Sequence, residues 1–410
     1  MADQEQFASQ IAHRPAASRA GLTRHQSITD EDVQAVADVL RSDWITQGPM
    51  IHAFEERVAA YCGARYAVAF SSGTAALHGA VFAAGIQPGD EVITTPLTFV
   101  ASANCAVYQG ATPIFADIDP GTLTIDPSRV AERIGAKTRA IIPVHFAGLP
   151  CDLGALAALA RLRGLVIIED ACHALGAEWR SPEGRWERIG SCSHSDMAVF
   201  SFHPVKHITT GEGGMVLTNR QEFARTLRMF RHHGILRAEE ISSSTDEPWV
   251  YAMEELGFNY RITDFQCALG LRQLERLDQG LQHRRIIAAR YQALCAKSGV
   301  AVQASDDAVR RHAWHLFVAQ LPLEQLAVDR KTVFQELRAA GIPVNVHYIP
   351  AYWHPFYRRQ FGYARGLCPA AERYYERAVT LPLSVHMSPA DVDWIMDTLR
   401  ASLESRIASV

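Results

Sequence analysis

The run SFHPVKHITTGEGG, at positions 201–214, is the most informative stretch of this chain. Lys206 lies between an apolar, strand-like segment and a set of glycines, with no other lysine nearby. A lysine among aromatic and histidine side chains can lose its proton and attack an aldehyde as a neutral amine. A solvated loop lysine is the simpler interpretation of Lys206 alone, so other motifs must decide.

The segment LVIIEDACHALG at positions 165–176 is typical of a buried strand that ends in a carboxylate. Asp170 would then lie at the carboxyl end of the strand, where parallel sheets place ligand-binding groups. There it would keep the pyridine nitrogen of pyridoxal 5′-phosphate (PLP) protonated, so that the ring accepts electrons. Aspartate is also a favoured helix N-cap, and both interpretations of Asp170 stay open.

The segment YAVAFSSGTAAL at positions 66–77 predicts a short strand, a turn of small residues and a helix. The unpaired amides and the positive end of the helix dipole at such a helix start attract a phosphate group. Gly73 would let the backbone approach the phosphate closely, and Thr74 would offer it a hydroxyl. Serine and threonine also cap many helices that bind nothing. Together, the phosphate turn, Asp170 and a lysine 206 − 170 = 36 positions later follow the order of a PLP site.

In these motifs the chain resembles the DegT/DnrJ/StrS family of sugar aminotransferases, from about residue 28 to the last helix. The strings SFHPVKHITTGEGG and EDACHALGA are highly specific to it. The resemblance implies a fold-type-I, PLP-dependent aminotransferase of the α/β class. We therefore expect a large lobe with a mainly parallel, helix-flanked sheet of the seven-stranded type, and a smaller C-terminal α/β lobe.

The resemblance also implies cofactor contacts. Lys206 forms the imine with the PLP aldehyde, Asp170 pairs with the pyridine nitrogen, and Phe99 stacks on the ring, although core packing is an alternative for Phe99. His173 stands where many relatives carry glutamine, near the phenolic oxygen, and either side chain can donate a hydrogen bond. The expected phosphate contacts are Gly73, Thr74, Ser201 and, from a neighbouring subunit, Asn259.

Three strings, SDWITQGP at 42–49, LGFNYRITD at 256–264 and NVHYIP at 345–350, most resemble the branch that acts in pseudaminic acid biosynthesis. The implied substrate contacts are Asp43, Trp44, Ile45, Thr46, His347, Tyr348, Ile349 and Pro350. A partly buried loop histidine is the alternative for His347.

The implied reaction moves the amino group of L-glutamate to C4 of UDP-2-acetamido-2,6-dideoxy-β-L-arabino-hexos-4-ulose. The product is UDP-4-amino-4,6-dideoxy-N-acetyl-β-L-altrosamine. Two alternatives stay open: another nucleotide-sugar 4-aminotransferase, such as the GDP-perosamine synthase type, or a non-catalytic PLP-binding protein.

The length of 410 residues, with 48% hydrophobic and 20% charged residues, fits two lobes. We expect a poorly ordered leader at 1–20, a large PLP-binding domain at 21–282 and a small domain at 283–410. The net charge of −4, with dispersed basic residues, argues against nucleic acid as a partner. A homodimer is expected, because Asn259 would complete the phosphate site only across an interface.

The eight cysteines show no CxxC spacing, so we expect reduced thiols, no metal site and a cytoplasmic location. No segment has the roughly 18 uninterrupted apolar residues of a membrane helix.

Hydrophobic periodicity predicts individual elements. Expected helices span 30–40, capped by Thr29, and 51–61, 264–281, 333–339 and 389–399. Expected strands span 91–95, 113–116, 140–144, 165–169, 197–201, 314–321 and 344–347.

Overall fold

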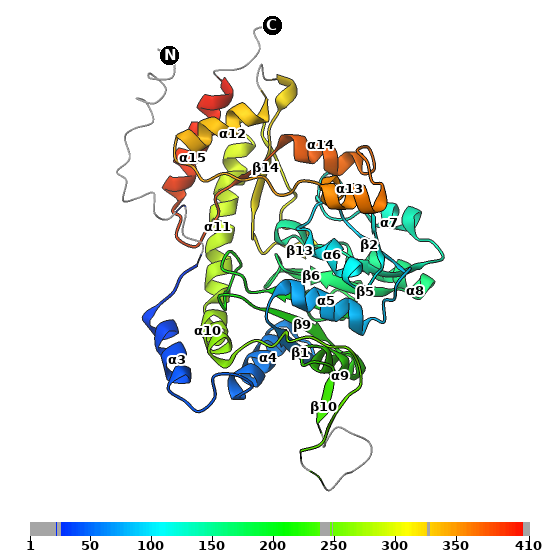
Figure 1. Cartoon of the computed structure of the whole chain (residues 1–410). Coiled ribbons are helices and arrows are strands. Elements are labelled where there is room, and N and C mark those ends of the chain that lie inside the picture. Colours follow the sequence, from blue (N-terminus) through cyan, green and yellow to red (C-terminus); the bar gives the residue numbers. More distant parts are fainter. Residues whose placement is uncertain (1–21, 23–25, 238–246, 248, 326–328, 405–410) are drawn as a thin grey trace.

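The structure is a computed structural model that describes residues 22, 26–237, 247, 249–325 and 329–404. The leader predicted at 1–20 lies outside the described residues. Figure 1 shows a lower part built around a large sheet and an upper part that contains the C-terminal helices, with the long helix α11 running between them.

A seven-stranded sheet in the order β1-β9-β8-β5-β4-β2-β3 forms the centre of the lower part. β9 is antiparallel to both β1 and β8, whereas all other neighbours are parallel, which confirms the mainly parallel α/β prediction. The strands are β1 (Tyr66–Phe70), β2 (Glu91–Thr94), β3 (Thr112–Phe115), β4 (Thr138–Ile142), β5 (Val166–Asp170), β8 (Met197–Ser201) and β9 (Gly214–Thr218).

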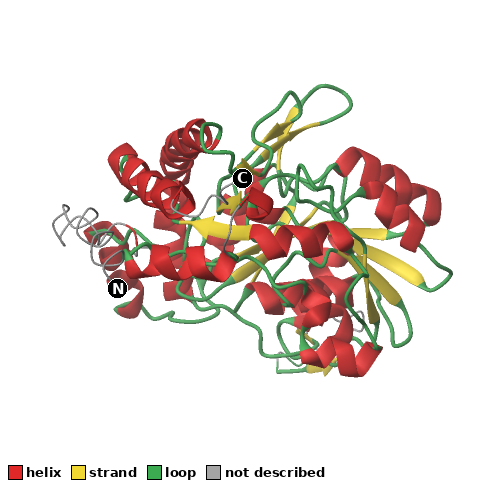
Figure 2. Cartoon of the chain, turned by 90° about the horizontal axis from the view of Figure 1, so that it is seen from above, coloured by secondary structure: helices red, strands yellow, loops and turns green. Residues whose placement is uncertain are grey.

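Helices cover both faces of this sheet, as seen from above in Figure 2. Alternate residues of a strand point to opposite faces, so Val68 and Phe70 of β1 pack in one core and Ala67 and Ala69 in another. The first face carries α5 (Gly73–Ala83), α6 (Ala101–Tyr108) and α9 (Gln221–Phe230). The second carries α4 (Pro49–Cys62), α7 (Pro127–Arg133), α8 (Leu153–Arg163) and α10 (Asp264–Glu275).

Helix α3 begins and ends as its capping signals predict, at Asp30–Leu40. The Thr29 side chain accepts a hydrogen bond from the Asp32 amide, and the Asp32 side chain accepts one from the Thr29 amide. This reciprocal capping box satisfies two amide donors that the helix leaves free.

The single helix predicted at 264–281 is wrong. Two helices occupy this stretch, α10 and α11 (Leu277–Cys295), and Arg276 between them leaves helical geometry at φ −104° and ψ 2°. The apolar periodicity continues across the break because both helices bury a face in the same core. The boundary predicted between residues 282 and 283 falls inside α11, and the division into two domains stays a prediction.

The upper part contains a three-stranded antiparallel sheet of β12 (Ala301–Val302), β14 (Phe317–Gln320) and β15 (Ala378–Leu381). The strand predicted at 344–347 does not form, because only Asn345 makes a backbone pair, with Thr380, and Pro343 has no N–H to extend it. The helices here are α12 (Arg330–Ala339), α13 (Pro355–Phe361), α14 (Pro369–Arg377) and α15 (Pro389–Glu404).

Small elements complete the described chain. β6 (Glu178–Arg180), β7 (Trp186–Arg188) and β13 (Arg310–Arg311) form a three-stranded antiparallel sheet. β10 (Ile235–Arg237) and β11 (Tyr251–Met253) form a two-stranded ribbon that projects at the bottom of Figure 1. Short 3-10 turns lie at Phe146–Gly148, Leu323–Gln325 and Ala351–Trp353.

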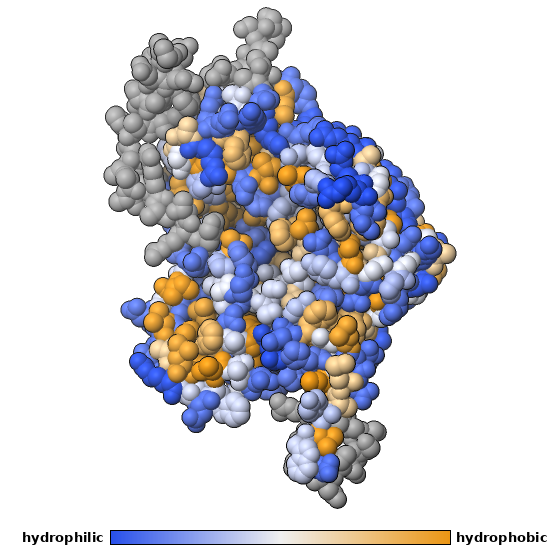
Figure 3. Space-filling view, viewed as in Figure 1, coloured by the Kyte–Doolittle hydropathy of each residue, from blue (hydrophilic) through white to orange (hydrophobic). Residues whose placement is uncertain are grey.

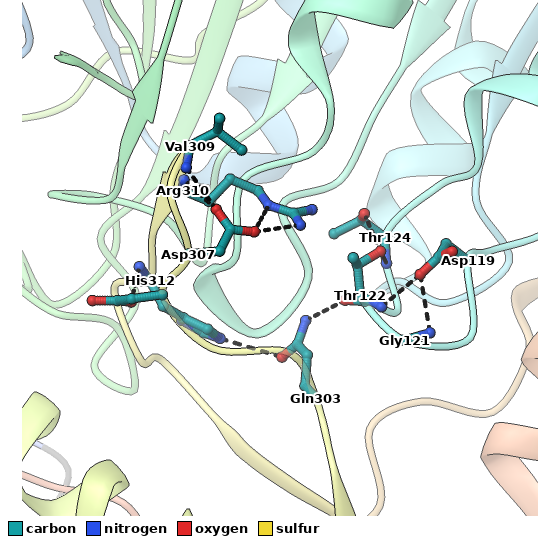
Figure 4. A network of polar contacts seen from close by, with 10 residues as sticks. Asp119, Gly121, Thr122, Thr124, Gln303, Asp307, Val309, Arg310 and His312 are labelled. Atoms are coloured by element: carbon teal, nitrogen blue, oxygen red, sulfur yellow. Dashed lines mark hydrogen bonds and ion pairs between the residues drawn. The ribbon is translucent and has the colours of Figure 1, made fainter.

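The buried side chain of Gln303, just after β12, joins the C-terminal strands to the large sheet (Figure 4). Its Nε2 donates to the carbonyl oxygens of Thr122, at 2.7 Å, and Phe146, at 3.1 Å. Its Oε1 lies 3.3 Å from Nε2 of His312. One amide therefore donates to two carbonyls, one half-buried and one buried, from loops of the large sheet.

No helix in the described ranges is long and apolar enough to cross a membrane. All eight cysteines lie in described segments and are free thiols; only Cys172 is partly exposed.

Candidate active site

A cavity of about 670 Å³ opens where α5 begins, at the carboxyl ends of β5 and β8. It brings together nine of the residues predicted from the sequence: Gly73, Thr74, Phe99, Asp170, His173, Ser201, Lys206, His347 and Tyr348. These residues come from segments up to 275 positions apart (348 − 73 = 275), and they meet because parallel strands end at one edge of the sheet.

The floor of the cavity is the turn between β1 and α5. The Ser72 side chain caps α5 by accepting a 3.1 Å hydrogen bond from the Ala75 amide, and Gly73 and Thr74 form the first turn. A Cβ atom on Gly73 would lie 2.8 Å from Cβ of Ser201, so only glycine lets β8 approach the helix start this closely. The remaining amides and the helix dipole create a site for an anionic group.

Asp170 ends β5, is only 5% exposed and begins no helix, so the helix-cap interpretation is wrong. Ser102 on α6 donates a 2.5 Å hydrogen bond to its Oδ2, and the Cys172 amide donates one of 3.1 Å to its Oδ1. Thr98 lies 2.6 Å from the Ser102 hydroxyl. These contacts fix the direction in which the buried carboxylate points.

Lys206 follows β8 on a turn in which its amide donates to the carbonyl of His203. Burial lowers the pKa of the Lys206 amine, while the acidic Cys172 and Asp170 groups act in the opposite direction. A larger neutral fraction makes this lysine a better nucleophile than a solvated one. The cavity lining shows that it is not an ordinary surface lysine.

His173 and Phe99 occupy different parts of the cavity wall. His173 is 5% exposed, its Nε2 lies 3.3 Å from the Tyr348 hydroxyl, and its buried Nδ1 has no partner among the described residues. Burial holds the pKa of His173 well below its usual value, so its ring is neutral. Phe99 is 59% exposed, which contradicts core packing and leaves its ring free to cover a ligand.

These residues lie within a stretch of the chain that matches a known protein family. Residues 26–400 match the sequence pattern of the DegT/DnrJ/EryC1/StrS aminotransferase family. The chain belongs to this family. Its members are PLP-dependent sugar aminotransferases, and the chain is therefore a PLP-dependent sugar aminotransferase.

Relatives of this DegT-family enzyme agree with that assignment. The spore coat polysaccharide biosynthesis protein SpsC of Bacillus subtilis is 41% identical over 374 residues, which cover 91% of this chain and 94% of SpsC. The PLP form of a sugar aminotransferase from Streptococcus pneumoniae, Spr1654, superposes with a TM-score of 0.84 at 31% identity, covering 92% of this chain and 97% of that one. Helicobacter pylori PseC, an aminotransferase involved in the biosynthesis of pseudoaminic acid, superposes with a TM-score of 0.83 at 29% identity, covering 93% and 98%.

The cavity of the DegT-family enzyme fits PLP in size and in chemistry. The start of α5 suits the phosphate, the buried Asp170 carboxylate suits a protonated ring nitrogen, and the Lys206 amine suits an aldehyde. The unpartnered Nδ1 of His173 supplies a polar atom for an oxygen of the cofactor.

Seven predicted site residues do not line this cavity in the single chain. Trp44 and Ile45 are at least half exposed, and Thr46 pairs with Thr263. Asn259 is exposed and pairs with His232. The full set is Asp43, Trp44, Ile45, Thr46, Asn259, Ile349 and Pro350, and their predicted roles stay predictions.

The residues predicted from the sequence do not include Ser72, which lines the cavity, or Ser102 and His315, which contact the cavity residues Asp170 and His173. Ser72 had a signal, because a serine before an alanine-rich helix is a typical N-cap. Ser102 had none, because it lies 68 positions from Asp170 along the chain. His315 packs its ring 4.3 Å from that of His173, and it too comes from a distant segment without a motif.

Proposed function

We propose that this enzyme transfers the amino group of L-glutamate to C4 of UDP-2-acetamido-2,6-dideoxy-β-L-arabino-hexos-4-ulose. The products are UDP-4-amino-4,6-dideoxy-N-acetyl-β-L-altrosamine and 2-oxoglutarate, and the step belongs to pseudaminic acid biosynthesis. The observation that carries the aminotransferase chemistry is the meeting of Lys206, Asp170 and the α5 phosphate turn in one cavity.

In this proposal PLP would be held by residues of this chain, and when bound it supplies an electron sink for charge that develops on the substrate carbon. The Asp170 carboxylate, oriented by Ser102 and the Cys172 amide, holds a proton on the ring nitrogen. Gly73, Thr74 and Ser201 hold the phosphate, His173 donates to the phenolic oxygen, and Phe99 covers the ring face.

Lys206 is the proposed general base and acid of both half-reactions. Its Nζ takes a proton from the substrate carbon and returns it two atoms away, as a 1,3-proton shift, which requires a neutral amine close to that carbon. The lowered pKa of Lys206 favours this state. His347 and Tyr348 line the same cavity, which supports their proposed role in contacting the sugar.

The choice of sugar rests on the strings at 42–49, 256–264 and 345–350 and on the likeness to PseC. The greater identity with SpsC, a spore coat polysaccharide biosynthesis protein, favours a second candidate, another nucleotide-sugar 4-aminotransferase that supplies a surface polysaccharide. The GDP-perosamine synthase type belongs to this second class. The remaining alternative, a protein that binds PLP without turnover, does not agree with membership of a family of PLP-dependent sugar aminotransferases.

A homodimer is part of the proposal, with Asn259 reaching the phosphate of the partner's site. Two observations support it. Asn259 is exposed and lies outside the cavity of its own chain. Apolar side chains also gather on the lower left of Figure 3, over the region of α3, α4 and α10, and Val33, Leu40, Trp44 and Ile45 are each at least half exposed.

Light scattering would test the assembly, and a fully active monomer would contradict it. A cytoplasmic location is also proposed, because all eight cysteines carry free thiols and disulfides are rare in that compartment.

The experiment that tests the substrate is a panel of UDP-, GDP- and dTDP-linked 4-keto sugars, assayed with glutamate and purified enzyme. We expect the UDP-linked L-arabino-hexos-4-ulose to give the highest kcat/KM. A GDP- or dTDP-linked sugar that is aminated far better would replace the first candidate with the second. Bound PLP without turnover of any sugar in the panel would contradict both candidates.

A further inference from the structure

A second cavity, of about 270 Å³, meets the candidate active site at Lys206, which lines both. It is formed where α10 gives way to α11, with walls from residues 26–27 and 385–386. We call it the Arg284 cavity, and the residues that matter here are Lys206, Arg276, Gly280 and Arg284.

The charged residues that line the Arg284 cavity are all basic, and none of its lining residues is acidic. Arg284 is 4% exposed, and its Nη1 donates only to main-chain oxygens, those of Trp314 and Leu383 at 3.1 Å and of His315 at 3.5 Å. Burial lowers the pKa of Arg284 to about 10, so the guanidinium is still charged at neutral pH. No carboxylate of the described residues forms an ion pair with it.

The other two cations of the cavity do not change this balance. The charge of Arg276 is offset by Asp32, at 2.6 Å. Lys206 has a lowered pKa, and its amine is engaged in the imine when it binds an aldehyde. Arg284 is therefore the buried cation without a compensating anion.

A buried charge is costly unless a counter-charge reaches it. The space beside Arg284 admits a small anion, and a guanidinium offers a planar set of donors that matches a carboxylate. The cavity is smaller than the neighbouring 670 Å³ cavity, which suits a small dicarboxylate better than a nucleotide sugar. Because Lys206 lines both spaces, an amino acid seated here would present its amine to the reacting centre.

We propose that the Arg284 cavity is the donor subsite, in which Arg284 binds a carboxylate of the amino donor. This inference rests on the proposed transamination, because it assigns one of its two substrates to a separate space. A separate subsite would keep the anionic donor apart from the anionic nucleotide sugar. Both substrates could then react in turn beside Lys206, which lines both cavities.

Gly280 offers a test that leaves Arg284 in place. It lies on α11 in the cavity wall, and an added Cβ would meet only Val385, at an ordinary 3.5 Å. Gly280→Asp and Gly280→Asn add side chains of equal size, but only the first adds a negative charge beside Arg284. Binding of glutarate, a dicarboxylate without an amine, to the PLP-loaded enzyme would be measured by titration calorimetry.

We expect wild type to bind glutarate and Gly280→Asp to bind it roughly tenfold or more weakly than Gly280→Asn, as for loss of a charge-assisted contact. Arg284→Met should weaken binding at least as much, whereas Arg290→Met, an exposed arginine on the same helix that pairs with Asp393, should not. Equal affinities of the Gly280 pair, or no glutarate binding by wild type, would overturn the proposal.

A second titration, with UDP, distinguishes the source of the anion. If the Gly280→Asp change weakens UDP binding and leaves glutarate binding unaffected, the cavity serves the nucleotide diphosphate and the donor assignment is wrong. Neither titration depends on which keto sugar the enzyme aminates. A failure of the sugar assignment therefore leaves the glutarate result intact, and the two failures can be told apart.

Discussion

The Ser102 hydroxyl donates a 2.5 Å hydrogen bond to Oδ2 of Asp170 and lies 2.6 Å from the hydroxyl of Thr98. Both Ser102 and Asp170 are buried, at 1% and 5% exposure, so water does not compete for the bond. The Asp170 carboxylate, which we expect to face the cofactor nitrogen, is thus held by α6, the helix that follows β2 along the chain. Its direction is a property of the packing of α6 against the sheet.

Replacing Ser102 with alanine should weaken PLP binding roughly tenfold, because a hydrogen bond to a charged group contributes about 1.5–3 kcal/mol. Titration of the PLP-free protein with the cofactor, followed by absorbance, would measure it. Ser298→Ala, which removes a hydroxyl that bonds only to the end of α11, is the matched control. Unchanged affinity in Ser102→Ala would mean that Ser102 does not position the carboxylate.

Gly73→Ala should reduce PLP affinity by roughly tenfold or more, since the new Cβ would lie 2.8 Å from Cβ of Ser201 and push β8 away from the α5 start. Gly154→Ala is the control. It also adds a methyl group in the first turn of a helix, α8, but its nearest neighbour is Trp179, at 3.5 Å. Equal PLP affinity in the two variants would argue against a phosphate site at Gly73.

Lys206→Ala should lower kcat by about 10²–10⁴, the usual contribution of a positioned acid–base group. Borohydride reduction of the wild-type enzyme, followed by peptide mass mapping, should place the cofactor label on residue 206. Lys331→Ala changes an exposed lysine of α12 and should leave both results unchanged. A label on any other residue would contradict the assignment of Lys206.

Stability should fall as the pH falls from about 6.5 toward 4. Burial lowers the pKa of His78 to about 4, that of His347 to about 4 and that of His207 to about 3. Below the unfolded pKa of about 6.5 the unfolded chain binds protons that the folded chain does not, so the free energy of unfolding decreases until the folded pKa is reached.

His78 contributes about 2 kcal/mol to this loss between pH 7 and pH 5. Urea unfolding at the two pH values should therefore show a smaller difference for His78→Gln than for wild type. The glutamine can still bond to Tyr260 or Gln109, which now contact the two ring nitrogens. A difference of the same size in both proteins would mean that His78 is not held neutral by the fold.

Gln303→Leu should lower the free energy of unfolding by about 1–3 kcal/mol, because it removes the donor of the half-buried Thr122 carbonyl and one of the two donors of the buried Phe146 carbonyl. Thermal or urea denaturation would measure the change. Gln325→Leu, at an exposed position, is the control. If Gln303→Leu were as stable as the control, water would have to replace the amide at both carbonyls.

Local sequence patterns predict the chemistry and most of the regular elements. Local patterns mark the turn at Gly73, the carboxylate of Asp170 and the amine of Lys206, and apolar periodicity with the Thr29 cap predicts α3 to the residue. Such features are local because strand alternation, helix caps and glycine turns depend on neighbours within a few positions.

The contacts by which these residues support one another arise from packing between distant segments. Ser102 reaches Asp170, Gln303 reaches Thr122, and Arg284 is enclosed without an acid, although no pattern marks any of these three residues. The break at Arg276 and the absence of a strand at 344–347 also differ from what hydrophobic periodicity predicts. Contacts between segments that are distant along the chain depend on which faces the fold brings together, and periodicity along one segment carries no information about that.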